Sequence, residues 1–188
     1  MKPLKINKPK LLLMACSITL SSTTLSQEMT GTHAAEPAWR VSAAYHPRFV
    51  RTELAYESKP FWATTLFNKR FDLRLDAFVA YWRALHSVKM RHSHRSLWQV
   101  GLTPMVRWWP ANHWYIEGGI GGLTLMNHTR FSNKEFSTAF QFGNSIGLGW
   151  FFADNWRFGM RYSHYSNASI KTPNPGFDIL SFSISHTF

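Results

Sequence analysis

The sequence predicts an all-β fold: an eight-stranded antiparallel β-barrel that crosses the outer membrane. The last eleven residues, 178–188, alternate apolar and polar side chains and end on Phe188, which is typical of a strand with one apolar and one polar face. Seven earlier segments alternate in the same way, and the N-terminus has the features of an export signal. A transmembrane barrel requires this combination, because it presents an apolar band to lipid and closes its last strand on its first.

Residues 1–35 are expected to be a signal peptide, which leaves residues 36–188 as one barrel domain. A basic start is followed by a mostly apolar stretch over residues 11–20 and then by small residues. The apolar stretch is too short to span a bilayer. The cleavage site stays open, with Ser26 and residues 34–35 as the candidates.

Eight segments after the signal alternate with a period of two residues. Their bounds are 39–45, 50–57, 71–81, 98–108, 114–120, 140–152, 156–163 and 178–188. One face of each segment is apolar and rich in aromatic residues, as the lipid side of a barrel requires. In chain order these faces hold Trp39, Val41, Ala43 and Tyr45; Val50, Thr52, Leu54 and Tyr56; Phe71, Leu73, Leu75, Val79 and Tyr81; Trp98, Val100, Leu102, Val106 and Trp108; Trp114, Ile116 and Ile120; Phe140, Phe142, Ile146, Leu148, Trp150 and Phe152; Trp156, Phe158, Met160 and Tyr162; Leu180, Phe182, Ile184 and Phe188.

The opposite faces carry the charged residues. Carboxylates are expected to pair with arginines inside the barrel, because buried charges need partners. The expected partners are Glu53, Asp72, Asp76 and Glu117 with Arg40, Arg74, Arg107, Arg157 and Arg161. Alternation alone does not decide which face is inside, since a soluble lipocalin-like barrel holds its apolar face inward. The export signal and the terminal Phe188 favour the membrane barrel.

The amino-acid composition limits the classes of molecule that the protein is expected to bind. The formal charge is +11, but the export signal and the high aromatic content argue against nucleic acid and favour an anionic membrane surface. Cys16 is the only cysteine and lies in the signal, so the mature chain is expected to have no disulfide and no thiolate chemistry.

Both termini of an even-stranded barrel face the periplasm, so residues 46–49, about 84–95, 127–135 and 167–177 are expected to be outer loops. The second of these is basic, and Lys89, Arg91 and Arg95 in it are candidate contacts for the phosphates of an anionic glycolipid. His86, His92 and His94 lie in the same loop without a carboxylate or cysteine nearby. We therefore interpret this loop as solvated and basic rather than as a metal site.

A serine and a histidine continue the apolar face of the seventh segment. His164 and Ser166 follow Tyr162 at every second position, so their side chains share one face and lean together as a nucleophile and its base. Asp178 begins the last segment on the corresponding face and is a candidate acid for orienting the imidazole. Interfacial polarity at a strand end is the plainer explanation of a lone His-x-Ser.

Residues 164–176, with Asp178, closely resemble the active-site segment of the lipid A 3-O-deacylases of the PagL type, and a weaker match runs through residues 116–121 and 142–149. The resemblance implies an eight-stranded outer-membrane barrel with a Ser-His-acid triad on its outside. It implies Ser166 as nucleophile, His164 as base, and Asp178 at a position where the family has Glu. It also places Asn167, Asn174 and Ser169 near the oxyanion site, Ser169 standing where Gly is usual.

The resemblance therefore predicts a serine esterase that removes the ester-linked acyl chain at position 3 of lipid A, with no metal and no cofactor. A non-enzymatic barrel, such as an adhesin or a structural protein, explains everything except the 164–178 segment. A lipid A acyltransferase differs only in using a lipid rather than water as acceptor. Association of two copies into a homodimer is left open by the sequence.

Overall fold

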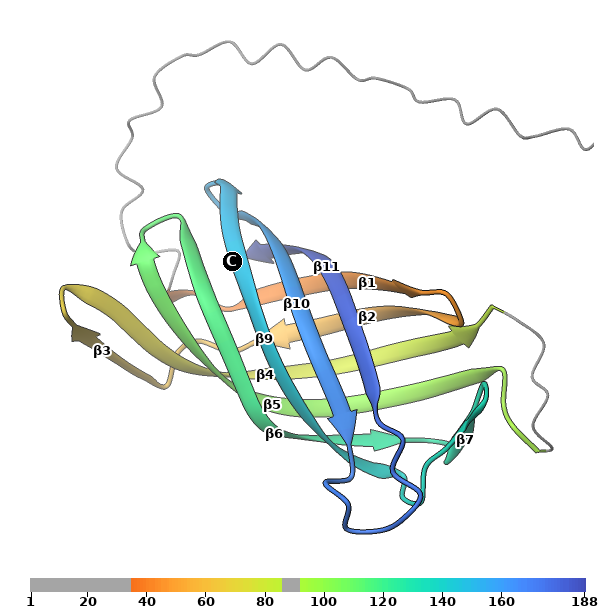
Figure 1. The fold of residues 1–188 in the computed structure, drawn as a ribbon. Helices are drawn as coiled ribbons and strands as arrows, with labels where there is room; N and C mark the ends of the chain where they lie inside the picture. The colour runs from red at the N-terminus through yellow and green to blue at the C-terminus, as the bar shows by residue number, and fades with distance from the viewer. Residues whose placement is uncertain (1–34, 86–91) are drawn as a thin grey trace, which may run out of the picture.

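The computed structural model describes residues 35–85 and 92–188, and the expected signal peptide lies almost entirely outside them. The described chain forms strands only, in one large sheet and one small hairpin (Figure 1). The strands are β1 (Ala38–His46), β2 (Phe49–Glu57), β3 (Trp62–Leu66), β4 (Lys69–Ala84), β5 (Ser96–Ala111), β6 (Trp114–Met126), β7 (Arg130–Phe131), β8 (Lys134–Glu135), β9 (Phe140–Ala153), β10 (Trp156–Ser166) and β11 (Phe177–Thr187). No helix in these ranges is long and apolar enough to cross a membrane.

The large sheet closes on itself and confirms the predicted eight-stranded barrel. Its order is β2-β1-β11-β10-β9-β6-β5-β4-β3, with every neighbouring pair antiparallel, and an additional β2–β4 pairing joins the two sides. The last strand pairs with the first, from Ala38 opposite Thr187 to Ala44 opposite Ser181. Closure removes the free strand edges that an open sheet would expose.

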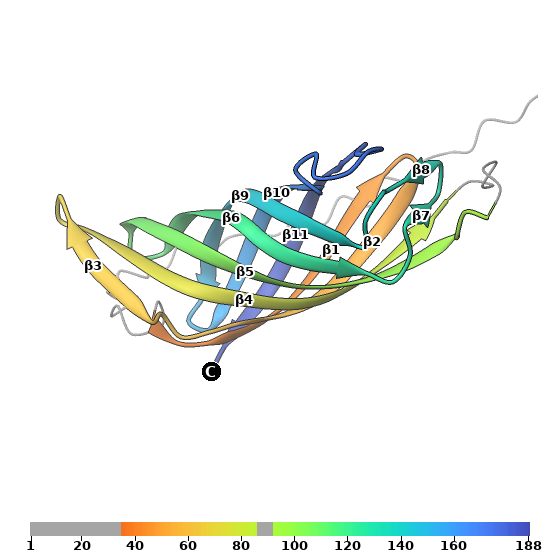
Figure 2. The same cartoon turned by 90° about the horizontal axis from the view of Figure 1, so that it is seen from below.

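Two strand pairs lie where the sequence predicts only loops. The 57–70 connection contains β3, which pairs with the first residues of β4 and extends away from the barrel (Figure 2). The 127–135 loop contains the β7–β8 hairpin. Both are short, and β3 is exposed on both faces, so neither has the alternation of a half-buried strand.

The charged faces point into the barrel, which settles the question that alternation left open. Arg40 lies at the centre of an ion-pair network and donates to Glu57 at 2.7 Å, Asp76 at 2.8 Å and Glu53 at 3.0 Å. Arg107 joins Glu57 at 2.6 Å to Glu117 at 2.9 Å. Arg157 reaches Glu57, Arg161 reaches Asp76 and Glu117, and Arg74 reaches Asp72. The prediction that inner carboxylates pair with arginines is therefore confirmed, but Glu57, which was not among the predicted carboxylates, is the shared partner of Arg40, Arg107 and Arg157. Removal of one partner from such a buried set typically costs about 3–5 kcal/mol.

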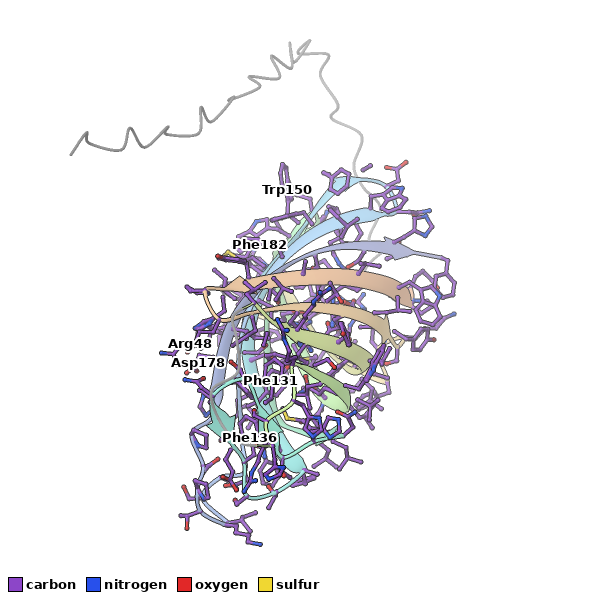
Figure 3. The ribbon with its side chains drawn as sticks, turned by 90° about the vertical axis from the view of Figure 1, so that its right-hand side faces the viewer. Arg48, Phe131, Phe136, Trp150, Asp178 and Phe182 are labelled. Carbon is purple, nitrogen blue, oxygen red and sulfur yellow. The ribbon has the colours of Figure 1, made fainter. Side chains whose placement is uncertain are left out.

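An aromatic cluster closes the outer end of the barrel interior. Phe49, Trp82, Phe131, Phe136 and Phe177 are all buried and in ring-to-ring contact with one another in pairs. Phe131 comes from the β7–β8 hairpin, so that hairpin packs over the barrel mouth rather than extending into solvent. Figure 3 shows Phe131 and Phe136 at this end, with Trp150 and Phe182 on the wall further along. The cluster fixes the loops that surround the start of β11.

Candidate active site

Strand pairing brings His164 opposite Asp178. Both lie at the outer ends of their strands, on β10 and β11, and are direct partners in the antiparallel register. Ser166 follows two residues after His164, opposite Phe142 of β9. The wall that carries them also holds exposed apolar residues such as Tyr162. The three predicted site residues therefore share the outer face of the barrel, at the rim where the strands end.

The His164 and Asp178 side chains form a hydrogen-bonded pair. The distance between His164 Nδ1 and Asp178 Oδ1 is 2.8 Å, and 42% of the histidine and 58% of the aspartate side chain are exposed. Direct opposition in the register explains why the short side chain of Asp178 reaches the imidazole. With Nδ1 facing the carboxylate, Nε2 is the ring nitrogen left for a proton acceptor role.

Ser166 lies on the same face but is not joined to the histidine. It is half-buried, and its hydroxyl makes no side-chain hydrogen bond to any of the described residues. In a strand, side chains at i and i+2 are about 7 Å apart, so a rotation of either side chain brings them together. Catalytic hydrogen bonds are often long without substrate.

Gly176 borders the imidazole. A Cβ on this residue would lie 3.0 Å from His164 Cε1 and 3.5 Å from Nε2, and its backbone has a φ of +58°. Both the conformation and the contact require glycine here, since other residues rarely adopt this φ. The residue therefore leaves room on the side of the ring that carries Nε2.

The loop after β10 is organised by two asparagines. The Asn167 backbone N–H donates to Asn174 Oδ1 at 3.0 Å, and Asn167 Nδ2 donates to Ser137 Oγ at 2.7 Å and to the Lys171 carbonyl at 2.8 Å. The donors of Asn167 are thus occupied within the loop. Asn174 Nδ2 faces Ser169 Oγ at 3.5 Å.

Ser169 takes a left-handed conformation with a φ of +61°, directly after Ala168 at +53°. Glycine adopts this region without cost, whereas residues with a Cβ adopt it less readily. Two successive left-handed residues form a tight turn, which the Ile170 N–H closes by donating to the Asn167 carbonyl at 3.1 Å.

The predicted glycolipid contacts are only partly described. Lys89 and Arg91, together with His86, lie outside the described residues, while Arg95 is exposed just before β5. Strands β1, β2 and β4 separate β5 from β11 in the sheet, so Arg95 lies on a different part of the barrel wall from His164 and Asp178. The rings of His94 and His128 stack with centroids 3.5 Å apart, and no group of three metal-ligating side chains occurs among the described residues.

Tyr162 is a site residue that the sequence pattern missed. Its hydroxyl donates to Asp178 Oδ1 at 2.8 Å, the same oxygen that faces His164. Tyrosine is expected in an aromatic girdle, so only its position two residues before His164 hinted at this contact. Tyr162 orients the carboxylate toward the imidazole.

Comparisons with known proteins agree on one family. The family model described as "Lipid A 3-O-deacylase (PagL)" matches residues 50–187. A protein from Bordetella bronchiseptica named "Lipid A deacylase PagL" is 40% identical over 142 residues, covering 74% of this chain and 77% of that protein. A protein of the same name from Pseudomonas aeruginosa is 38% identical over 64 residues, 34% of this chain and 36% of its own. The solved "Crystal structure of the outer membrane enzyme PagL" is similar with a TM-score of 0.67 at 23% identity, covering 80% of this chain and 99% of that one.

Proposed function

The chain belongs to the lipid A 3-O-deacylase (PagL) family, and we infer from this membership that it is an outer-membrane hydrolase that removes the ester-linked acyl chain at position 3 of lipid A. We propose that Ser166, His164 and Asp178 are its catalytic triad. The observation that carries the proposal is the His164–Asp178 pair at 2.8 Å on the outer wall, with Ser166 on the same face. The lipid-facing rim is the place where an acyl ester in the outer leaflet meets water.

Each member of the triad has one chemical role. His164 Nε2 takes the hydroxyl proton of Ser166 as Oγ forms a bond to the ester carbonyl carbon. The tetrahedral intermediate collapses, the bond to the sugar oxygen breaks, and His164 returns the proton to that leaving oxygen. Asp178 holds the imidazole through Nδ1 and stabilises its charged form. Water then attacks the acyl-enzyme by the same route and releases the fatty acid.

The oxyanion of the intermediate requires donors on the opposite side of the carbonyl from the histidine. We propose Asn174 Nδ2 and the Ser169 backbone N–H for this role, because both lie in the loop that leaves Ser166. Asn167 contributes by positioning Asn174 through its backbone N–H. Removal of one such donor typically lowers the rate by about 10²–10³-fold.

Lys89, Arg91 and Arg95 are proposed as outer contacts for the lipid A headgroup, supported by the basic character of the 84–95 loop. The contacts would act on recognition rather than on the chemical step. Gln at all three positions is expected to raise KM and to weaken its dependence on salt, while kcat stays near wild type. An unchanged KM at low ionic strength would remove the loop from the proposal.

The decisive experiment is mass spectrometry of lipid A from cells with the wild-type chain, the Ser166→Ala variant, or no chain. We expect the wild type alone to yield lipid A that lacks one acyl chain, with the free fatty acid as the second product. Ser96→Ala, at the outer end of β5, is the matched control and should behave as wild type. If the lost acyl chain is recovered on another lipid, the enzyme is an acyltransferase. Activity of Ser166→Ala near the wild-type level would exclude Ser166 as the nucleophile.

A further inference from the structure

A polar pocket lies on the other side of Asp178 from the catalytic histidine. It has a volume of about 450 Å³ and is formed by the β1–β2 turn, the β7–β8 hairpin and the start of β11. Arg48, Lys134 and His46 line it together with Asp178. Figure 3 shows Arg48 and Asp178 next to each other on this side of the barrel. The pocket therefore shares a wall with the proposed triad.

Lys134 is fixed in place by the backbone that leads into β11. Its ammonium group donates to the carbonyl of Gly176 and lies 4.8 Å from the centroid of the Phe177 ring. Burial lowers the pKa of Lys134, and the nearby Arg48 lowers it further, while Asp178 opposes the change. An anion bound between the two cations would relieve this repulsion.

Arg48 has no such anchor. Its guanidinium is exposed, and no carboxylate of the described residues lies within ion-pair distance of it. The turn that carries it is nevertheless fixed, because the Arg48 carbonyl accepts from the Leu85 N–H at 2.9 Å and its N–H donates to His46 Nδ1 at 3.1 Å. A fixed backbone thus presents a guanidinium, which matches phosphate oxygens with two parallel donors.

The carboxylate in the pocket is directed elsewhere. Asp178 Oδ1 accepts from Tyr162 and faces His164, so its hydrogen bonds lie on the catalytic side, although its charge also acts on Lys134. With Arg48 and Lys134 both cationic, the pocket keeps a net positive charge for a ligand. These two cations stand next to the triad, whereas Arg95 lies beyond three intervening strands.

We propose that Arg48 and Lys134 bind a phosphate monoester of the lipid substrate and thereby place the scissile ester at Ser166. The proposal rests on the proposed function, because it concerns recognition of the same substrate. A phosphate and the scissile ester on one glycolipid headgroup occupy neighbouring sites, and the shared Asp178 wall provides that arrangement. Binding energy from this remote group is used to orient the ester.

The test compares two substrates, phosphorylated lipid A and the same lipid A with its phosphates removed, in detergent micelles of fixed composition. Wild type should hydrolyse both, with a KM on the phosphorylated substrate lower by about 10-fold or more, since hydrogen bonds from a cation to a phosphate are stronger than neutral ones even when solvent partly screens them. Arg48→Gln and Lys134→Gln should each remove most of this preference. Neither should change kinetics on the phosphate-free substrate by more than about twofold.

Three controls separate the outcomes. Arg83→Gln removes an exposed arginine from the outer end of β4, where it lies opposite Val50 of β2 but does not line the pocket, and should keep the preference. Lys134→Arg keeps the charge and should therefore keep the preference for the phosphorylated substrate. This variant distinguishes the loss of the charge from a loosening of the β7–β8 hairpin. Heat-modifiable gel migration reports that each variant is folded. Equal KM values for the two substrates in the wild type would overturn this proposal alone, whereas no hydrolysis of either substrate would overturn the proposed function.

Discussion

Asp178→Asn tests the electrostatic part of the proposed triad. One oxygen of Asp178, Oδ1, meets both His164 Nδ1 and the Tyr162 hydroxyl at 2.8 Å. An asparagine can place its carbonyl oxygen at that position and keep both hydrogen bonds. The substitution therefore removes the negative charge while the imidazole orientation is preserved.

The size of the effect follows from the exposure of the pair. Two unit charges about 4 Å apart interact by ~1 kcal/mol in water and ~4 kcal/mol at the effective dielectric constant of a protein surface. With 42% and 58% of the two side chains exposed, the stabilisation of the imidazolium lies within that range. Since ~1.4 kcal/mol is tenfold in rate, we expect kcat to fall by about 5- to 10³-fold.

The assay is release of fatty acid from lipid A in detergent micelles, with kcat and KM measured separately. KM should change little, because the ester is bound elsewhere. Asp178→Glu keeps the charge on a side chain that is longer by one methylene group, so it should retain most of the activity. If Asp178→Asn kept kcat within about twofold of wild type, the aspartate would have no role in charge stabilisation, and the 2.8 Å contact would be structural.

Three further predictions follow from contacts at the site and at the closure of the barrel. Tyr162→Phe removes one of the two donors to Asp178 and should lower kcat by about 3- to 30-fold, the loss of roughly one hydrogen bond; the same kinetics measure it, and an unchanged kcat would remove Tyr162 from the site. Gly176→Ala forces a β-carbon to within 3.0 Å of the His164 ring and into a left-handed backbone, so kcat should fall at least tenfold while the barrel still shows heat-modifiable migration; full activity would contradict the close approach. Deleting Phe188, whose N–H donates to the Pro37 carbonyl at 3.3 Å, should reduce membrane insertion, and normal fractionation of the truncated chain would show that closure does not need it.

Sequence alone was sufficient for the barrel, because each strand carries its own period-two pattern with charges on the inner face. It also predicted that His164, Ser166 and Asp178 share a face. The contact between His164 and Asp178 depends on the register of β10 with β11, and register is a non-local property set by closure of the whole sheet. The distance between the Asp178 carboxylate and the His164 imidazole could therefore be obtained only from the three-dimensional structure.

The short strands and the position of Lys134 could not be predicted, because the sequence shows no pattern for them. The β3 and β7–β8 strands are two to five residues long, too short for an alternation to be distinguished from chance. Lys134 follows a turn and resembles any solvated lysine in the sequence. Its position under Gly176 depends on the aromatic cluster that holds the β7–β8 hairpin over the barrel mouth.

The filled interior of the barrel has a consequence for transport. The space between Arg51, Glu53 and Tyr165 amounts to about 20 Å³, roughly the room that one water molecule needs, and aromatic rings close the outer end. The protein is therefore expected to add no ionic conductance to a planar bilayer. Water for hydrolysis is therefore expected to reach the rim from the external medium rather than through the barrel. Catalysis is thus confined to one side of the membrane, and the permeability barrier of the cell stays intact while its outer lipid is remodelled.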